Sequence, residues 1–476
     1  LHGSVAYNVG ALYPVSSDVS FVKLERTIRK LLKKHPVLRT VIEEKNGLAD
    51  PAEINENNWT LQSLYNFESL QQLLQIPFDL ERDYMLRAYV VYENGLPQSL
   101  FLIVHHLVTD GWAMPLIVDE INAIYSENPN EETRMISAGY KDYKRWQQNQ
   151  DNSAGIDFWK NYLEEVQVLQ IAHDFKKQYP HPDSGRQFQF EIDEALTAAL
   201  TKISEEQSTT LYTTLVSAFG LLMQYYSGQS DICIGSPFAN RPHPFDRTIG
   251  YFANMLPVRL KIDGNPGFSE FLRQNRDLMP AIFQHQHVPL ETIISQVIKD
   301  RFAGHNPLFQ TIFVLQQPIE VSQNKQVIHS EKIEWIFNER VKFDLQFEAL
   351  PVDKKLKFNI DYSDVLFNEK TIVEMAGFFR LILESIAADP EKKIGEIVLG
   401  PTSDNSSDEL PEAMQMNKTF MELFEEQVEK TPQKTAMVFS GKGISYEKTI
   451  GTLFQSFNDG LVDYRLLFHT GAKHGK

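Results

Sequence analysis

The sequence predicts a mixed α/β protein whose chain folds into two packed lobes. Its 476 residues exceed the roughly 250–300 residues at which a single hydrophobic core stops growing. Segments with helical spacing of apolar residues alternate with short β-branched runs in both halves of the chain. Between the halves, "QYPHPDSG" at residues 178–185 places two prolines and a glycine between a helical segment and a strand. We therefore expect a first lobe at residues 1–178 and a second lobe at residues 179–399.

The first lobe is expected to contain a helix, a strand and a β-hairpin in that order. Residues 20–34 carry apolar side chains at helical spacing, with Asp18 or Ser20 as the N-cap and a proline just beyond the end. "VLRTVIEE" then has the composition of a strand. In "MLRAYVVYENGLPQSLFLIVHH", two apolar runs flank an Asn-Gly pair, which is typical of a two-residue hairpin turn. Helical spacing resumes soon afterwards, so His105 and His106 are predicted to lie at a junction between a strand and a helix.

The second lobe is expected to alternate helices and strands. We predict a helix at "TLYTTLVSAFGLLMQYY" and strands at "RQFQFEI", "DICIGSPF", "NMLPVRLKI", "TIFVLQ" and "LKFNIDYS". Residues 400–416 are polar, acidic and rich in Ser and Asp, which indicates a linker. Beyond them, "TFMELFEEQVEKTP" has the pattern of a short amphipathic helix, and residues 450–476 form an atypical tail without a clear pattern.

Composition excludes several classes of protein. A net charge of −17 argues against nucleic acid as a partner, because phosphate binding requires clustered Lys and Arg. Cys233 is the only cysteine, so no disulfide forms within the chain, and its apolar surroundings predict a buried residue. Without an apolar run of about 20 residues or a signal-peptide pattern, we expect a cytoplasmic protein with no membrane partner. The first residue is not Met, so we expect a fragment of a longer chain.

The segment "FLIVHHLVTDGW" holds the candidate functional residues. Adjacent residues of a strand point to opposite faces, so at most one of His105 and His106 can face a given cavity. Three interpretations compete: a hydrogen-bonded polar strand end, a metal site, and acid/base chemistry. A metal site is the weakest of these, because zinc requires three or four ligands and only Asp110 accompanies the histidines. Acid/base chemistry suits imidazole, which titrates near neutral pH, and a backbone N–H near Gly111 could face a developing oxyanion.

The segment His105–Gly111 matches the HHxxxDG motif of the condensation domains of nonribosomal peptide synthetases. Companion segments resemble those of the family in the same order along the chain: "KKHPVLRTVI", "IPFDLERDYMLRAYV", "YKDYKRW", "SGQSDICIGSPFANR", "IGYFANMLPVRL", "HQHVPLETI", "HNPLFQTIFVLQ" and "KFDLQF". Residues 417–449 are similar to the start of an adenylation domain, without the nucleotide-binding motifs that would follow. The chain thus resembles one condensation domain followed by a linker and a truncated adenylation start.

The resemblance implies two chloramphenicol-acetyltransferase-like lobes in a V-shaped arrangement with a central tunnel. It implies amide bond formation between a donor acyl or peptidyl thioester and an acceptor aminoacyl thioester. Both substrates would arrive on the 4′-phosphopantetheine arms of upstream donor and downstream acceptor peptidyl carrier domains, with no covalently bound cofactor and no metal in the chain itself. An adjacent adenylation domain is a further expected partner.

The resemblance also assigns roles to individual residues. His106 would face the tunnel as general base or as the group that orients the amine, His105 would be structural, and Gly111 would give backbone access. Asp110 would hold the loop through an arginine, and two arginines are candidates, Arg259 and Arg39. Further residues expected to brace the loop or line the tunnel are Asn254, Tyr251, Trp112 and Lys34.

Two departures from the family pattern stand out. The usual first segment, SxAQxRxW, is missing. Lys34 replaces the first arginine of the RHExLRTxF motif, which retains charge but loses the planar fork of arginine.

Two other functions stay open. One is a related enzyme of the same fold, either an epimerisation domain or an acyltransferase that uses a free amine or alcohol. The other is a non-catalytic remnant that serves as a docking platform. The intact HHxxxDG segment and the "NPLF" and "FANR" segments favour condensation over both alternatives.

Overall fold

The computed structural model describes residues 4–67, 69–126, 138–176, 183–297, 307–316, 326–329, 332–399, 435–439 and 442–445. Contacts divide the chain into two compact units, Leu1–Gly400 and Pro401–Lys476. In the second unit, the described residues form a hairpin of β14 (Thr435–Phe439) and β15 (Lys442–Ser445). The expected linker, the helix predicted at "TFMELFEEQVEKTP" and the tail at residues 450–476 lie outside the described residues.

The first lobe is built on a five-stranded sheet with the order β11-β1-β6-β5-β4. Its strands are β1 (Asn8–Pro14), β4 (Gln62–Leu64), β5 (Leu86–Glu93), β6 (Leu96–His105) and β11 (Glu334–Ile336). Its helices are α1 (Phe21–Lys34), α2 (Ser69–Leu74) and α3 (Ala113–Ser126), with short 3-10 turns at Pro36–Arg39 and Glu56–Asn58. A separate hairpin joins β2 (Thr40–Lys45) to β3 (Leu48–Glu53).

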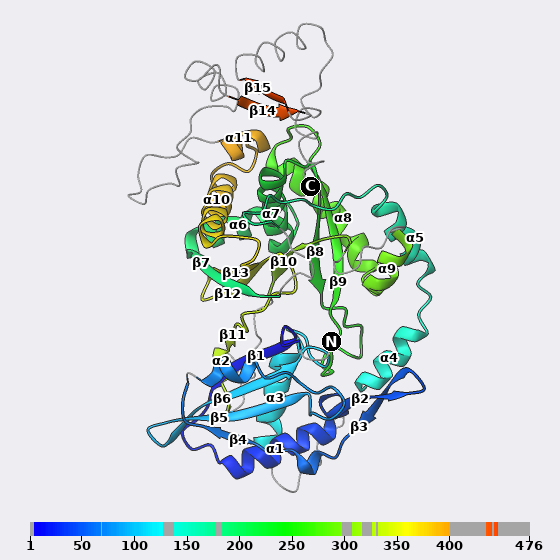
Figure 1. Ribbon diagram of the computed structural model, residues 1–476, viewed down its shortest axis with the longest axis vertical. Coiled ribbons are helices and arrows are strands. Elements are labelled where there is room, and N and C mark those ends of the chain that lie inside the picture. The colour runs from blue at the N-terminus through cyan, green and yellow to red at the C-terminus, as the bar shows by residue number, and fades with distance from the viewer. Residues whose placement is uncertain are drawn as a thin grey trace. The chain divides into compact units, whose positions relative to one another are not determined.

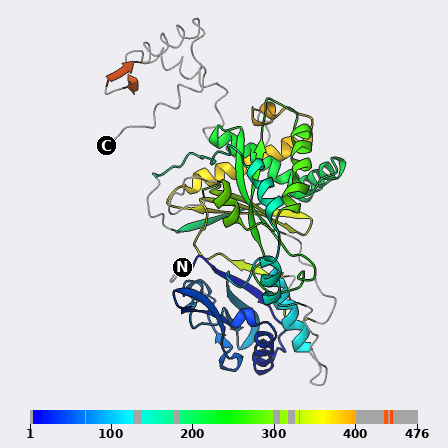
Figure 2. The ribbon, with the colours of Figure 1, turned by 90° about the vertical axis from the view of Figure 1, so that its right-hand side faces the viewer.

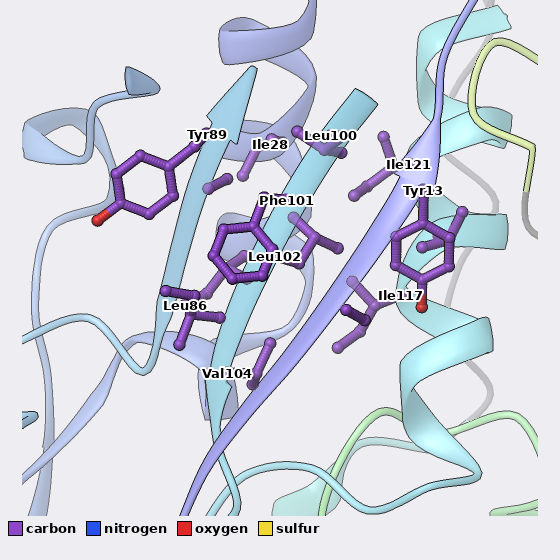
Figure 3. Close-up of a cluster of buried hydrophobic side chains, with 14 of the residues drawn as sticks. Tyr13, Ile28, Leu86, Tyr89, Leu100, Phe101, Leu102, Val104, Ile117 and Ile121 are labelled. Atoms are coloured by element: carbon purple, nitrogen blue, oxygen red, sulfur yellow. The ribbon is translucent and has the colours of Figure 1, made fainter. Parts of the chain in front are cut away.

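The predicted helix at residues 20–34 is α1, and its chemistry explains its bounds. Ser20 caps it, because the Ser20 hydroxyl accepts a hydrogen bond from the backbone N–H of Lys23. Its apolar face, which includes Leu24, Ile28 and Leu31, is fully buried against the core that α3 also covers. Figure 3 shows this core, where side chains of β1, β5 and β6 meet those of α1 and α3.

The predicted hairpin of β5 and β6 delivers the double histidine. Asn94 and Gly95 both have positive φ, 52° and 79°, which is the conformation that a tight turn between two strands requires. Strand β6 lies between β1 and β5, and its second half is buried on both faces. The last residue of β6, His105, lies opposite Asn8 of β1. The hairpin therefore fixes where the chain leaves the sheet.

The second lobe is built on a six-stranded mixed sheet with the order β7-β13-β12-β10-β8-β9. Its strands are β7 (Gly185–Ile192), β8 (Asp231–Phe238), β9 (Asn254–Lys261), β10 (Thr311–Leu315), β12 (Leu345–Val352) and β13 (Lys355–Ser363). The remaining helices of the described residues are α4 (Tyr140–Gln148), α5 (Ser153–Tyr162), α6 (Glu194–Glu206), α7 (Leu211–Ser227), α8 (Phe268–Gln284), α9 (Leu290–Val297), α10 (Glu369–Ala388) and α11 (Ile394–Leu399). Helices α6, α7 and α10 pack against this sheet (Figure 1, Figure 2).

The two faces of this sheet differ in polarity across β7, β13 and β12. One face carries Phe347 and Phe358, which contact Phe219 of α7 or Phe379 of α10. Alternate residues of the same strands are polar, and neighbours in the ladder bring them together. They are Gln187 and Gln189 of β7, Gln346 and Glu348 of β12, and Asn359 and Asp361 of β13. This polar face becomes important next to the candidate site.

Two elements pack outside the lobe to which their place in the sequence assigns them. Strand β11 comes from the second half of the chain but pairs with β1 in the first sheet (Figure 1). Helix α5 precedes residue 178, yet its Trp159 is fully buried with Cys233 and Leu256 of the second lobe. The expected division at residue 178 does not coincide with the packing of these two elements. None of the described helices is long and apolar enough to cross a bilayer.

Candidate functional site

The two histidines are held by backbone hydrogen bonds at the end of β6 and occupy different environments. The His105 N–H donates to the carbonyl of Met85 (3.0 Å), and the His106 N–H donates to the carbonyl of Tyr7 (2.8 Å). The His105 ring is 6% exposed and packs against the rings of Tyr7 and Phe78, at centroid distances of 6.1 and 5.5 Å. Burial lowers the pKa of His105 to about 4, so its ring is neutral at pH 7.

The His106 ring is only half-buried and lies edge-on to the ring of Tyr251, with a centroid distance of 5.4 Å. Burial, and then the charge of Lys342, lower the pKa of His106 to about 3. The backbone carbonyls of His106 and Thr109 act in the opposite direction by accepting hydrogen bonds from this side chain. A neutral imidazole whose N–H is held in this way presents its other nitrogen as a hydrogen-bond acceptor.

Asp110 fixes the loop that follows the histidines. Its Oδ1 accepts hydrogen bonds from the backbone N–H of Ala113 (2.8 Å) and from Arg241 Nη2 (2.8 Å). Its Oδ2 accepts from the backbone N–H groups of Phe252 (2.9 Å) and Ala253 (3.1 Å). One carboxylate therefore caps the turn into α3 and binds the connection between β8 and β9 of the second lobe.

The prediction that Arg259 or Arg39 holds Asp110 is wrong. Arg259 binds Asp231 through Nε and Nη2, at 2.8 and 2.6 Å, and Arg39 binds Glu53 at 2.9 Å. Arg259 lies well inside β9, whereas Arg241 follows the end of β8, on the connection that approaches the histidine loop. The position along the strand, rather than the residue type, decides which arginine reaches Asp110.

Arg241 is the functional residue that the sequence interpretation missed. Its guanidinium donates to the carbonyls of Thr248 (2.6 Å) and Gly250 (3.3 Å) and lies 4.2 Å from the centroid of the Phe252 ring. Burial lowers its pKa, and the charge of Asp110 opposes this effect. The signal was present in the sequence, because Arg241 is the last residue of the "SGQSDICIGSPFANR" segment.

Of the other candidate residues, three lie next to the histidine loop. Tyr251 is 38% exposed beside His106, and Trp112 is 44% exposed and donates from Nε1 to the carbonyl of Asp246 (3.3 Å). Gly111 is exposed, and its N–H has no acceptor among the residues that the structure describes. A Cβ at Gly111 would meet the Gln316 side chain at an ordinary contact distance of 3.5 Å.

The remaining two candidates have structural partners. Asn254 Nδ2 donates to the carbonyls of Gln286 (2.8 Å) and Val288 (2.7 Å), so this side chain ties β9 to the segment before α9. Lys34, at the end of α1, forms an ion pair with Glu120 of α3. Both side chains hold elements of the fold together.

Comparison with known proteins gives the family. A family model for the condensation domain matches residues 1–409. The chain is 29% identical over 464 residues to tyrocidine synthase 3 of Brevibacillus parabrevis and 28% identical over 461 residues to gramicidin S synthase 2 of Brevibacillus brevis. Each alignment covers 93% of this chain but only 7% and 10% of the relative, so the chain spans about a tenth or less of these synthases.

Solved structures share the fold at low sequence identity. The X-domain from teicoplanin biosynthesis superposes with a TM-score of 0.70 at 20% identity, covering 82% of this chain and 91% of that one. The first condensation domain of the calcium-dependent antibiotic synthetase, solved with a substrate analogue, superposes with a TM-score of 0.69 at 14% identity, covering 83% and 94%. The mixed α/β fold is thus the condensation-domain fold, as predicted. With the family model matching most of its length, the chain belongs to the condensation-domain family of nonribosomal peptide synthetases.

Proposed function

We propose that this chain catalyses amide bond formation between two thioester-bound substrates. The acceptor amine attacks the thioester carbonyl carbon of the donor, and the carbonyl π electrons move to oxygen. Collapse of this intermediate breaks the C–S bond. The donor acyl group leaves its carrier for the acceptor nitrogen, the amine loses a proton, and the donor carrier is released as a free thiol. The substrates are carried on 4′-phosphopantetheine arms that enter a tunnel between the lobes.

One observation supports this proposal most directly: His106 is accessible and neutral, whereas its neighbours are fully engaged. His105 and Asp110 are buried and hydrogen bonded, so neither is available to a substrate. His106 is half-buried beside Tyr251 and offers one ring nitrogen. Among the three polar side chains of the motif, His106 is therefore the one proposed to contact the amine.

The low pKa of His106 favours an orienting role over that of a strong base. General base catalysis is most efficient when the pKa of the base lies near the working pH, and the pKa of His106 is about 3. A neutral imidazole can still accept a hydrogen bond from the amine and align its lone pair with the carbonyl. Holding both thioesters in one site supplies the larger part of the rate enhancement through proximity. The N–H of Gly111, which has no acceptor among the described residues, is a candidate donor to the oxygen on which charge develops.

The partners of the chain follow from the same proposal. Donor and acceptor peptidyl carrier domains deliver the substrates, and an adjacent adenylation domain, whose start residues 417–449 resemble, is a further partner. A four-domain nonribosomal peptide synthetase solved with AMP and glycine superposes on 96% of this chain with a TM-score of 0.71 at 18% identity. This assembly would operate in the cytoplasm, where soluble synthetases meet their substrates.

The test uses donor and acceptor carrier domains loaded with several pairs of substrates. We expect the unmodified protein to form a dipeptidyl thioester, detected by mass spectrometry, and His106→Ala to lose most of this activity. Lys355→Met, which changes an exposed lysine paired with Glu191, is the matched control and should leave the rate unchanged. A protein that forms no product with any pair contradicts the proposal. Equal product from His106→Ala removes His106 from the assigned role.

The same experiment distinguishes the alternatives. Chiral analysis of the donor residue detects epimerisation, and free amines or alcohols offered in place of the acceptor carrier detect a simpler acyltransferase. A crystal structure of the teicoplanin X-domain with OxyB also superposes on this chain, with a TM-score of 0.69 at 21% identity, so the fold alone does not separate catalysis from a docking role. A folded protein without any of these activities would favour the docking platform.

A further inference from the structure

Lys342 lies on the segment that crosses from the first sheet to the second. This segment connects β11 to β12 and is anchored on both sides. The Asn338 side chain donates to the carbonyl of Val5 at 3.0 Å, next to β1. On the other side, the backbone N–H of Val341 donates to the carbonyl of Asp183 (2.8 Å), next to β7. The position of Lys342 is therefore fixed by both lobes rather than by a free loop.

The ammonium group of Lys342 points to the region of the two histidines. Lys342 Nζ lies 5.1 Å from the centroid of the Tyr7 ring. Tyr7 contacts both histidines, through its ring with His105 and through its carbonyl with the N–H of His106. Burial first, and then the positive charge of Lys342, lower the pKa of both His105 and His106, so the ammonium group lies within electrostatic range of the two rings. The Lys342 side chain is exposed, but desolvation by the surrounding protein lowers the pKa of Lys342 to about 8.

The acidic neighbour of Lys342 is engaged elsewhere. Asp361 on β13 accepts hydrogen bonds from Gln187 Nε2 (2.8 Å) and Gln346 Nε2 (3.2 Å). Burial and the nearby charge of Glu348 raise the pKa of Asp361 to about 7. Both of its oxygens are thus occupied by amide groups, and its charge is incomplete near neutral pH. The charge of Lys342 is therefore only partly offset.

The second carboxylate of this polar face is held in the same manner. Glu348 accepts from Gln316 Nε2 (2.7 Å) and from Asn359 Nδ2 (3.1 Å). Gln316 is also the side chain nearest to Gly111, which connects the polar face to the histidine loop. Side-chain amides thus donate to the oxygens of both carboxylates, and Lys342 forms no direct ion pair with either carboxylate among the described residues.

We propose that Lys342 supplies a fixed positive charge to the reaction centre and stabilises the negative charge that forms on the donor carbonyl oxygen. This inference rests on the proposed amide-forming function. When the amine nitrogen forms its bond to the carbonyl carbon, the π electron pair moves to the oxygen, and the C–S bond breaks when that pair returns. A fixed cation nearby favours the oxyanion relative to the uncharged substrate carbonyl. The same charge adds to the effect of burial, which is the main cause that keeps the neighbouring imidazoles neutral.

The first test compares a variant that removes the positive charge of Lys342 with a variant that keeps it. Under single-turnover conditions with loaded carrier domains, we expect Lys342→Met to form the dipeptidyl thioester about 10- to 100-fold more slowly. Lys342→Arg, which keeps the charge, should stay within about fivefold of the unmodified protein. Lys355→Met controls for the loss of a distant lysine. The inference is overturned if Lys342→Met reacts at the normal rate, or if Lys342→Arg is as slow as Lys342→Met.

The pH dependence of the rate gives a readout that a structural role would not change. The rate of the unmodified protein should decline above about pH 8, where Lys342 loses its proton, and Lys342→Arg should lack this decline. The titratable groups that face Lys342 are His105, His106, Asp361 and Tyr7, with Glu348 behind Asp361. Both histidines are already neutral in this range, and Asp361, with a pKa of about 7, is half ionised at pH 7 and gains most of its remaining charge by pH 8, in the Lys342→Arg variant as well as in the unmodified protein.

A measurement without turnover separates this inference from the proposed function. Histidine NMR with 13C labels at the ring carbons, recorded between pH 4.5 and 8, follows the protonation of His105 and His106. Lys342→Met should raise their pKa values by about 1, and Lys342→Arg should leave them in place. Unchanged histidine titration in Lys342→Met contradicts the inference even if the protein forms no product. If the histidine pKa values shift in Lys342→Met as expected but the unmodified protein forms no product, the proposed function is contradicted and this inference is not.

Discussion

Asp110 and Arg241 join the two lobes through an ion pair in which each side chain is only 3% exposed. Asp110 follows β6 of the first sheet, and Arg241 follows β8 of the second, with a distance of 2.8 Å between Oδ1 and Nη2. Because the same carboxylate also binds three backbone N–H groups, the pair fixes the loop that carries His106. The position of the functional histidine therefore depends on contacts from both lobes.

Removal of either partner should destabilise the protein strongly. We expect Asp110→Ala and Arg241→Met each to lower the free energy of unfolding by about 3–5 kcal/mol, since each leaves a buried charge without its partner. Urea unfolding measures the change. Glu191→Gln, which breaks an exposed ion pair with Lys355, is the control and should cost less than about 1 kcal/mol. If Asp110→Ala and Arg241→Met unfold at the same urea concentration as Glu191→Gln, the ion pair between Asp110 and Arg241 does not hold the two lobes together.

Gly250 should tolerate no side chain, because it lies against the ring of Tyr140. A Cβ at Gly250 would come within 2.2 Å of Tyr140 Cδ2. We expect Gly250→Ala to destabilise the protein by about 1–3 kcal/mol through overpacking. Thermal unfolding gives the measurement.

Gly377→Ala is the matched control for this substitution. Gly377 lies inside α10 with open space around its Cβ position, so alanine should stabilise the helix by about 0.5–1 kcal/mol. If Gly250→Ala unfolds at the same temperature as the unmodified protein, the contact with Tyr140 is not tight.

The two histidines should differ in their effects on stability and activity. His105→Ala removes a buried ring between Tyr7 and Phe78 and should lower the free energy of unfolding by about 2–4 kcal/mol. His106→Ala removes a half-buried ring and should cost less than about 1 kcal/mol while abolishing most product formation. Urea unfolding and the loaded-carrier assay are run on the same preparations. A larger loss of stability in His106→Ala would reverse the assignment of structural and functional roles.

His35 should make the protein less stable in mild acid. Burial lowers the pKa of His35 to about 4 in the folded state, whereas an unfolded histidine has a pKa of about 6.5. Between these values the unfolded chain binds a proton that the folded chain does not. The contribution of neutral His35 to the free energy of unfolding is therefore fully present above about pH 6.5. It is lost as the pH falls toward about 4.

The variant His35→Gln isolates this contribution. We expect the free energy of unfolding to fall less steeply between pH 7 and pH 5 in His35→Gln than in the unmodified protein. The buried His105 remains in both proteins and contributes the same slope to each. Identical pH dependence in the two proteins would show that folding does not lower the pKa of His35.

Local sequence patterns alone predict the secondary structure around the site and the identity of the candidate residues. The cap of α1, the Asn-Gly turn and the apolar runs of β5 and β6 are local patterns, and each appears in the structure where the pattern predicts it. The alternation of residues in a strand also predicted that His105 and His106 would face different surroundings. The sequence also indicated the family, because the motifs that resemble those of the family occur in the same order along the chain.

Contacts between side chains far apart in the sequence became known from the three-dimensional structure alone. Arg259, Arg39 and Arg241 are equivalent as residue types, and the connection between β8 and β9 brings Arg241 alone of the three to Asp110. Strand β11 pairs with β1 in the first sheet. This pairing places the following segment, which includes Lys342, near the histidines. Ion pairs and the fields of charged groups depend on distances in space, and local sequence patterns do not encode the separation between residues more than a hundred positions apart.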